Sequence, residues 1–282
     1  MWGGVFLKIR FRKIYFIAVI FLVVLMTKYI LVENVVKHTP EFSENLQKFR
    51  KFNIDGTLLE ELKEQEKRAE YLSTAFLYGD GKVSQKVYLE SRGSLFSYLL
   101  PASKEKPYIK AIQTVIGDIE YFPIPLDQEG GVGIRFEDSW GNARNYGGSR
   151  KHEGCDIMPE NNESGYFPVL SISDGVIEKK GWLELGGYRI GIRAPGGAFF
   201  YYAHLDSYEP GLNIGDMVSA GQTLGYMGNS GYGEEGTKGK FDVHLHFGVY
   251  MDIDGKEVSI NPYQILKYLE NYRKTFYRNQ EV

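Results

Sequence analysis

The residues best suited to chemistry in this chain are histidines. The chain has five, and four of them lie in its second half. His244 and His246 are one residue apart in an apolar run, and alternate side chains of a strand share a face, so both imidazoles project from the same side. His152 and Asp156 also share a face if their segment is extended, and His204 lies in another strand-like run. Imidazole nitrogens and a carboxylate oxygen suit Zn²⁺, whose catalytic sites use three protein ligands and leave a fourth position for water.

The sequence around these residues resembles a known enzyme family. Three segments, His152-Glu-Gly-Cys-Asp156-Ile, Tyr202-Ala-His204-Leu and His244-Leu-His246-Phe, follow one another in the order of the three motifs of the M23 (LytM/lysostaphin-type) zinc metallopeptidases. The connecting segments 215–225 and 228–231 resemble the glycine-rich segments of that family as well. The resemblance covers about residues 122–265 and leaves the N-terminal 120 residues uncovered.

This resemblance implies a role for each of the five residues. His152, Asp156 and His246 would bind one zinc ion per chain. His204 and His244 would be the catalytic pair that does not bind the metal. Zinc makes hydroxide available from a bound water and polarises a carbonyl, while imidazoles can take and give protons near neutral pH. Which of the two histidines acts as the general base stays open at this stage.

The same alternation of faces predicts where the neighbouring side chains point. Cys155 should face away from the ligands and behave as a small buried apolar residue, and Tyr202 should share a face with His204. We also expect the glycine-rich loop upstream of His152 to border a substrate groove. The loop residues with side chains suited to this are Asn142, Asn145 and Tyr146.

From residue 122 onward, the sequence predicts a mainly β catalytic domain of antiparallel sheets, as in LytM and lysostaphin. Glycine becomes frequent there, and short apolar runs alternate with turns, which is typical of antiparallel sheets. The apolar spacing after Pro262 predicts a closing helix that reaches residue 277. We expect the domain to span 122–282, with strands at 169–178, 188–194, 198–204, 223–227 and 243–251.

The N-terminus predicts a membrane anchor. Residues 1–32 hold five basic side chains and no acid, so with a net charge of −3 the rest of the chain carries −8. Residues 14–32 are apolar apart from Thr27 and Lys28, and 19 residues suffice to cross a bilayer as a helix. A basic segment at 1–13 favours a cytoplasmic N-terminus and an extracytoplasmic remainder. A cleaved signal peptide is the competing interpretation, but no small-residue cleavage site follows the apolar run.

The sequence of residues 33–121 predicts a helical membrane-proximal region. Thr57 and Glu60 have the spacing of a capping box, and apolar residues recur at helical intervals from there to Phe76. The glycines at 79 and 81 should end this helix. No residue of this region has the pattern of a catalytic group, and an envelope protein could bind it.

Together these features favour a membrane-anchored zinc endopeptidase of the bacterial cell membrane, acting on peptidoglycan stem peptides or cross-bridges. Two other interpretations stay open. One is a non-hydrolytic scaffold or channel component of the cell envelope, for example in sporulation, and the other is a zinc-binding module without catalysis. The near-neutral charge argues against nucleic-acid binding. The single cysteine excludes an intrachain disulfide and a zinc site built from several cysteines.

Overall fold

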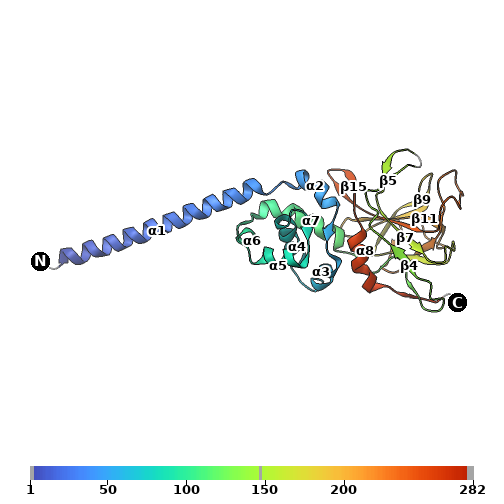
Figure 1. Ribbon diagram of the computed structural model, residues 1–282, viewed down its shortest axis with the longest axis horizontal. Helices are drawn as coiled ribbons and strands as arrows, with labels where there is room; N and C mark the ends of the chain where they lie inside the picture. Colours follow the sequence, from blue (N-terminus) through green and yellow to red (C-terminus); the bar gives the residue numbers. More distant parts are fainter. Residues whose placement is uncertain (1–2, 146–147, 278–282) are drawn as a thin grey trace.

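The fold was analysed in a computed structural model, which describes residues 3–145 and 148–277. A long N-terminal helix leads into a group of short helices, and these pack on one end of a β domain (Figure 1). The long helix α1 (Gly3–His38) contains the predicted span 14–32 and continues beyond it. Its segment Arg12–His38 has a mean hydropathy of 2.5 and is not buried by the rest of the chain, so it has the length and composition to cross a membrane.

Aromatic side chains form the core of the helical region. Phe49, Phe76 and Tyr108 are buried, and their rings meet edge-on or tilted. The short parallel strands β1 (Asn53–Ile54) and β2 (Lys82–Val83) tie the region together. Its helices are α2 (Phe42–Arg50), α3 (Gly56–Glu61), α4 (Arg68–Tyr78), α5 (Gln85–Arg92), α6 (Leu95–Leu99) and α7 (Ala102–Ile116).

The helix expected from Thr57 to Phe76 is interrupted in the structure. Its N-cap lies two residues earlier than the capping-box prediction, because the Asp55 carboxylate, not the Thr57 side chain, accepts a backbone N–H there, that of Thr57, at 2.9 Å. Between α3 and α4 the chain turns, and the Arg68 guanidinium donates to the Leu59 carbonyl at 2.8 Å. That bond satisfies a carbonyl at the end of α3, so the break is stabilised. The predicted end at Gly79 is confirmed.

One ten-stranded sheet with antiparallel pairing dominates the β domain, as predicted. Its main path runs β12-β9-β10-β11-β14-β7-β4, with β13, β8 and β15 attached at its side. The strands are β4 (Ile134–Phe136), β7 (Cys155–Pro159), β8 (Pro168–Leu170), β9 (Gly175–Leu183), β10 (Gly187–Arg193), β11 (Phe199–Tyr208), β12 (Met217–Val218), β13 (Thr223–Met227), β14 (Leu245–Ile253) and β15 (Lys256–Ile260). Short pairs form between β5 (Ala143–Arg144) and β6 (Arg150–Lys151), and between β3 (Leu126–Asp127) and β16 (Thr275–Phe276).

Two predicted elements of this domain differ from the structure. The run 169–178 is two strands, β8 and β9, because the turn at Asp174-Gly175 separates strands that pair with different neighbours. The closing helix is shorter than expected, with α8 (Tyr263–Leu269) followed by one 3₁₀ turn, η1 (Glu270–Tyr272). Arg273 then leaves the helical conformation, and its side chain donates to the carbonyls of Ile124 and Pro125, which aligns β16 with β3.

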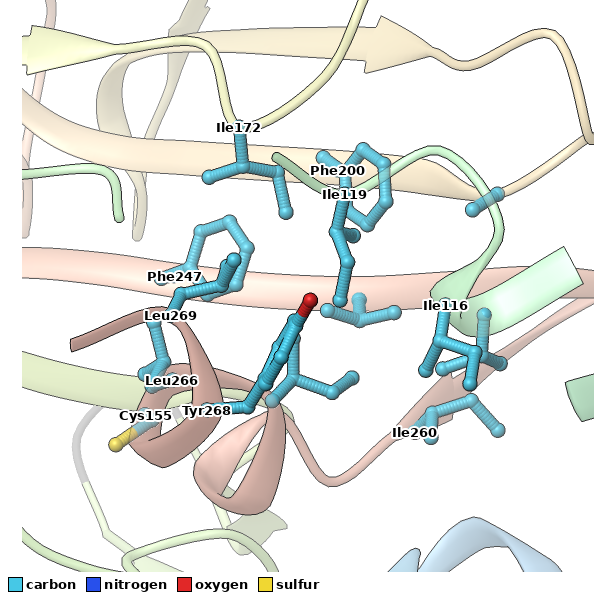
Figure 2. Packing of buried hydrophobic residues seen from close by; sticks show 14 of the residues in the cluster. Ile116, Ile119, Cys155, Ile172, Phe200, Phe247, Ile260, Leu266, Tyr268 and Leu269 are labelled. Atoms are coloured by element: carbon cyan, nitrogen blue, oxygen red, sulfur yellow. The ribbon is translucent and has the colours of Figure 1, made fainter. Parts of the chain in front are cut away.

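The buried core is continuous from the helical region into the β domain. Figure 2 shows Ile116, the last residue of α7, and Ile119, three residues after it, in one cluster with Phe200 and Phe247 of the central strands, with Ile119 next to Phe200. From the other side, α8 places Leu266, Tyr268 and Leu269 against the same strands (Figure 2). Polar bonds join the two parts as well, since Arg50 of α2 donates through Nε to the Ser259 carbonyl of β15 at 2.9 Å. The helices therefore brace the strands that carry the candidate site.

Replacing Tyr202 by phenylalanine should destabilise the β domain. The Tyr202 side chain is fully buried, and its hydroxyl accepts the Ile172 N–H at 3.0 Å. Tyr202→Phe would leave that buried N–H without a partner, which costs about 1–3 kcal/mol of folding free energy. The melting temperature of the full chain in detergent should fall by several degrees. Tyr226→Phe is the control, because that hydroxyl makes only a long bond of 3.3 Å to Glu209; an equal fall in both variants would contradict the prediction.

Candidate active site

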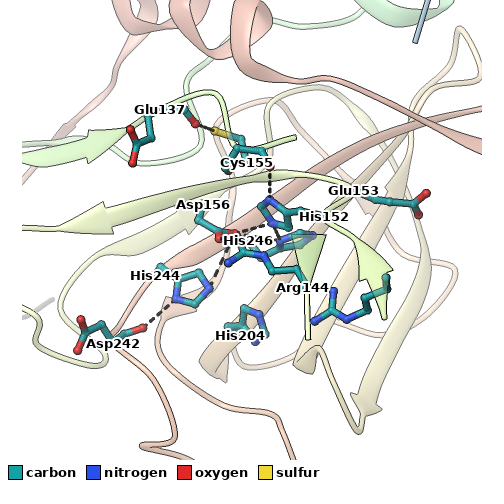
Figure 3. Close-up of polar contacts among 12 residues, drawn as sticks. Glu137, Arg144, His152, Glu153, Cys155, Asp156, His204, Asp242, His244 and His246 are labelled. Carbon is teal, nitrogen blue, oxygen red and sulfur yellow. Dashed lines mark hydrogen bonds and ion pairs between the residues drawn. The ribbon is translucent and has the colours of Figure 1, made fainter. Parts of the chain in front are cut away.

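Strand pairing brings together three of the predicted residues. β14 runs antiparallel to β7, and in their register His246 stands directly opposite Asp156, 90 positions away in the chain. His152 lies just after β6, at the entrance to β7, and its backbone is fixed by a bond from its N–H to the Asn142 carbonyl at 2.8 Å. As a result the ligand atoms of His152, Asp156 and His246 converge on one point (Figure 3).

The spacing of these three atoms fits a tetrahedral metal site. His152 Nε2 lies 3.0 Å from Asp156 Oδ1 and 2.9 Å from His246 Nδ1. His246 Nδ1 lies 3.1 Å from the same carboxylate oxygen. Ligand atoms bound tetrahedrally at about 2.0–2.1 Å from zinc are roughly 3.3 Å apart. A small movement of the three atoms away from one another would therefore accommodate one ion between them.

The protonation states of the imidazoles also favour a cation. His152 Nδ1 lies 3.0 Å from the Ser139 carbonyl oxygen, which can only accept, so Nδ1 carries the hydrogen and Nε2 presents its lone pair. Burial lowers the pKa of His246, which keeps that ring neutral at pH 7. The lone pair of His152 Nε2 thus faces the carboxylate oxygen of Asp156, with no hydrogen from His152 between them. The set of N and O donors matches the preferences of zinc.

Arg144, which the sequence analysis did not single out, is a fourth residue of this cluster. Its guanidinium forms an ion pair with Asp156 Oδ2, so the carboxylate offers only Oδ1 to the other ligand atoms. Arg144 lies on β5, directly opposite Arg150 of β6. Of the loop residues expected near the groove, Asn142 fixes the backbone of His152 and lines a cavity beside Asp156. Tyr146 lies outside the residues that the structure describes.

The two remaining histidines lie beside the three ligand residues. The rings of His204 and His244 are 4.7 Å apart between centroids. His204 Nδ1 donates to the Ser230 carbonyl and His244 Nδ1 to the Asp242 carbonyl, both at 2.8 Å, so each Nε2 is left with a lone pair. Burial lowers the pKa of His244 and lowers that of His204 well below its ordinary value. Both imidazoles are therefore neutral at pH 7 and can accept a proton.

The backbone at His204 explains a wrong prediction about the tyrosines. Strict alternation places Tyr202 with His204, but the structure buries Tyr202 in the core and places Tyr201 in the cleft instead. His204 has a φ of +62°, which L-residues rarely adopt, and the pairing of β11 with its neighbours shifts register next to it. The kink turns the imidazole to the face that Tyr201 occupies.

All five residues line one cleft of about 350 Å³. Arg144 and Arg150 form one part of its wall, and Tyr201, Tyr232 and Phe241 supply aromatic surface. The prediction for Cys155 is confirmed: its side chain is fully buried away from the cleft, and its thiol donates to the Glu137 carbonyl at 3.2 Å. Burial raises the pKa of this thiol to about 12, so it is a poor metal ligand at neutral pH.

Comparison with known proteins agrees with this geometry. Residues 150–262 match the model of peptidase family M23. The crystal structure of LytM from Ruminococcus gnavus is 43% identical in sequence, covers 82% of this chain and 93% of its own, and superposes with a TM-score of 0.67. The chain belongs to peptidase family M23. The mainly β, LytM-like fold predicted from the sequence is thereby confirmed.

Two curated relatives match over shorter segments. The L-Ala–D-Glu endopeptidase of Bacillus subtilis is 42% identical over 151 residues, which is 54% of this chain and 44% of that protein. Lysostaphin of Staphylococcus simulans is 33% identical over 102 residues, which is 36% of this chain and 19% of that protein. The chain therefore spans less than half the length of these curated relatives.

Removing one ligand residue should remove the metal. We expect the full chain in detergent to bind about one Zn²⁺, and Asp156→Ala to lose it, because the remaining imidazoles would have no carboxylate beside them. Elemental analysis after extensive dialysis measures the zinc content. His38→Ala is the control, because His38 lies in α1, outside this cluster. Stoichiometric zinc in Asp156→Ala would show that the ligands are different.

Proposed function

We propose that the protein is a membrane-anchored zinc endopeptidase that hydrolyses peptide bonds in bacterial peptidoglycan. The observation that carries this proposal is the convergence of His152, Asp156 and His246 on one point beside the neutral pair His204 and His244. The donor set suits zinc, and the pair offers proton-accepting nitrogens that line the same cleft.

In this proposal His152, Asp156 and His246 hold the metal. Zinc, when bound, makes hydroxide available from water near neutral pH and polarises a peptide carbonyl. Arg144 keeps Asp156 oriented through Oδ2, and the Ser139 carbonyl keeps His152 in the tautomer that presents Nε2. The ligands therefore need little rearrangement to bind the ion.

In this proposal His204 and His244 carry out the proton transfers of the reaction. Because burial keeps both rings neutral, either Nε2 can take the proton from the attacking water. The resulting imidazolium can stabilise negative charge on the carbonyl oxygen or donate its proton to the leaving amine. The carbonyls of Ser230 and Asp242 hold the two Nδ1–H groups, so both rings keep their Nε2 atoms available.

Peptidoglycan is the proposed substrate because of the relatives and the predicted location. The names of two M23 relatives specify endopeptidases that cleave L-Ala–D-Glu or glycyl-glycine bonds. Such bonds occur in stem peptides and cross-bridges outside the cell membrane. The proposed domain division is a cytoplasmic segment 1–13, an anchor at 14–32, a helical region 33–121 and the peptidase domain 122–282.

Substitution of either catalytic histidine should abolish hydrolysis without loss of zinc. The full chain in detergent, loaded with zinc, should release new amine ends from purified cell wall. His204→Ala and His244→Ala should lower the rate by about 10²–10⁴-fold, because each removes a proton-transfer group. Zinc content should stay near that of the parent, and His38→Ala should be fully active. An intact chain that retains zinc but releases no amines would overturn the hydrolase and favour a non-hydrolytic scaffold.

The orientation in the membrane can be tested with cysteine labelling. The native thiol is fully buried, so an introduced cysteine gives the only expected signal from an impermeant maleimide. A cysteine at Lys86, whose side chain is 83% exposed, should label in intact cells. One at Gly4 should label only after lysis, because the basic segment is expected in the cytoplasm. The reverse pattern would contradict the proposed orientation.

A further inference from the structure

Two arginines face each other beside the ligand residues. Arg144 and Arg150 are directly paired across the antiparallel ribbon of β5 and β6, and both line the cleft. Side chains that are opposite one another in such a ribbon lie on one face, and two like charges there are destabilising. Nothing in the ribbon itself explains why two guanidinium groups occupy this pair.

The negative charge available in the cleft is too small to balance them. Asp156 is the only acidic residue among the described residues that line the cleft. One of its oxygens binds Arg144 and the other belongs to the proposed metal site. With a divalent ion bound, the positive charge would exceed the negative charge still further, so the cleft favours an anionic ligand.

Arg150 is the guanidinium that remains available. Its Nε is buried and has no hydrogen-bond partner among the described residues. Its one hydrogen bond to a described residue is long, 3.4 Å from Nη2 to the Tyr232 hydroxyl, and no described carboxylate lies within ion-pair distance. A buried N–H of this kind is costly unless something binds it. A carboxylate matches the planar fork of donors that arginine presents.

We propose that Arg150, with Arg144 beside it, forms a subsite for a free carboxylate of the substrate peptide, next to the bond that is cut. The subsite rests on the proposed function, since its ligand is a cell-wall peptide with an acidic residue. It also sets a preference, because a neutral cross-bridge of glycine residues would leave Arg150 without a partner. Acidic stem peptides should therefore bind better than glycine bridges.

Binding of two matched peptides tests the subsite. One is alanyl-glutamate extended through the side-chain carboxyl of glutamate, with its α-carboxylate free, and the other is identical except for an α-carboxamide. Calorimetry with the zinc-loaded full chain in detergent, in a His204→Ala background to prevent cleavage, gives both Kd values. The acid should bind at least about tenfold more tightly, because a charge-assisted pair is worth that much.

Arg150→Gln should reduce the ratio of the two Kd values by about tenfold, mainly through weaker binding of the acid. The matched control is Lys151→Gln, which removes the same charge from the next residue, an exposed side chain that does not line the cleft. It should leave the ratio within twofold. Arg150→Lys keeps the charge without the fork, so an intermediate ratio is expected, and this variant decides the matter if Arg150→Gln does not fold.

Three results would overturn the subsite. They are equal Kd values for the two peptides in the His204→Ala chain, an unchanged Kd ratio in the Arg150 variants, or an equal fall of that ratio in Lys151→Gln. Failure of the proposed function shows separately, as no release of amines from cell wall by the zinc-loaded parent chain. A ratio that depends on Arg150 in a chain that does not cleave would support the subsite and reject the hydrolase.

Discussion

The candidate site depends on one register, the pairing of β14 with β7 that places His246 opposite Asp156. The other edge of β14 pairs with β11, where Ala203 stands opposite His246. One strand therefore positions two ligand residues and, through its neighbour, the adjacent His204. Because side chains alternate with a period of two, a slip by one residue would turn His246 into the core. The chemistry of the cleft thus requires that this strand cannot slide.

The hydrophobic core supplies that restraint. Leu245, Phe247 and Val249 alternate with the cleft-facing residues of β14 and are fully buried. They belong to the same buried cluster as side chains from α7 and α8, and Figure 2 shows Phe247 together with Ile116 of α7 and Leu266 of α8. A shifted strand would expose three large apolar side chains, and each would lose about 1.5–3 kcal/mol of burial free energy. The helices that precede the β domain are therefore structural partners of the site, and they are more than a spacer.

Sequence reasoning succeeded where a regular pattern decided the outcome and failed where contacts between distant segments did. Alternation along one strand was enough to place His244 and His246 in one cleft. The family resemblance named the three residues whose nitrogen and oxygen atoms the fold brings within 3.1 Å of one another. No sequence pattern marks the kink at His204, so alternation assigned Tyr202 to the cleft, where the structure places Tyr201. The interruption between α3 and α4 depends on a side chain of the following helix. The Arg144–Asp156 ion pair joins the β5–β6 ribbon to β7, which belongs to a different sheet. The one signal for it in the sequence is the presence of basic residues shortly before His152.

A close backbone approach at Gly187 supports the strained conformation of His204. A non-glycine residue in the left-handed region costs of order 1–3 kcal/mol and persists only where its surroundings fix it. Here the His204 N–H donates to the Gly186 carbonyl at 2.8 Å, and Nδ1 donates to the Ser230 carbonyl. A Cβ on Gly187 would lie 2.2 Å from that same Ser230 oxygen, so only glycine lets the two segments approach. The close approach at Gly187 thus helps to hold a strained, buried and neutral imidazole beside His152, Asp156 and His246.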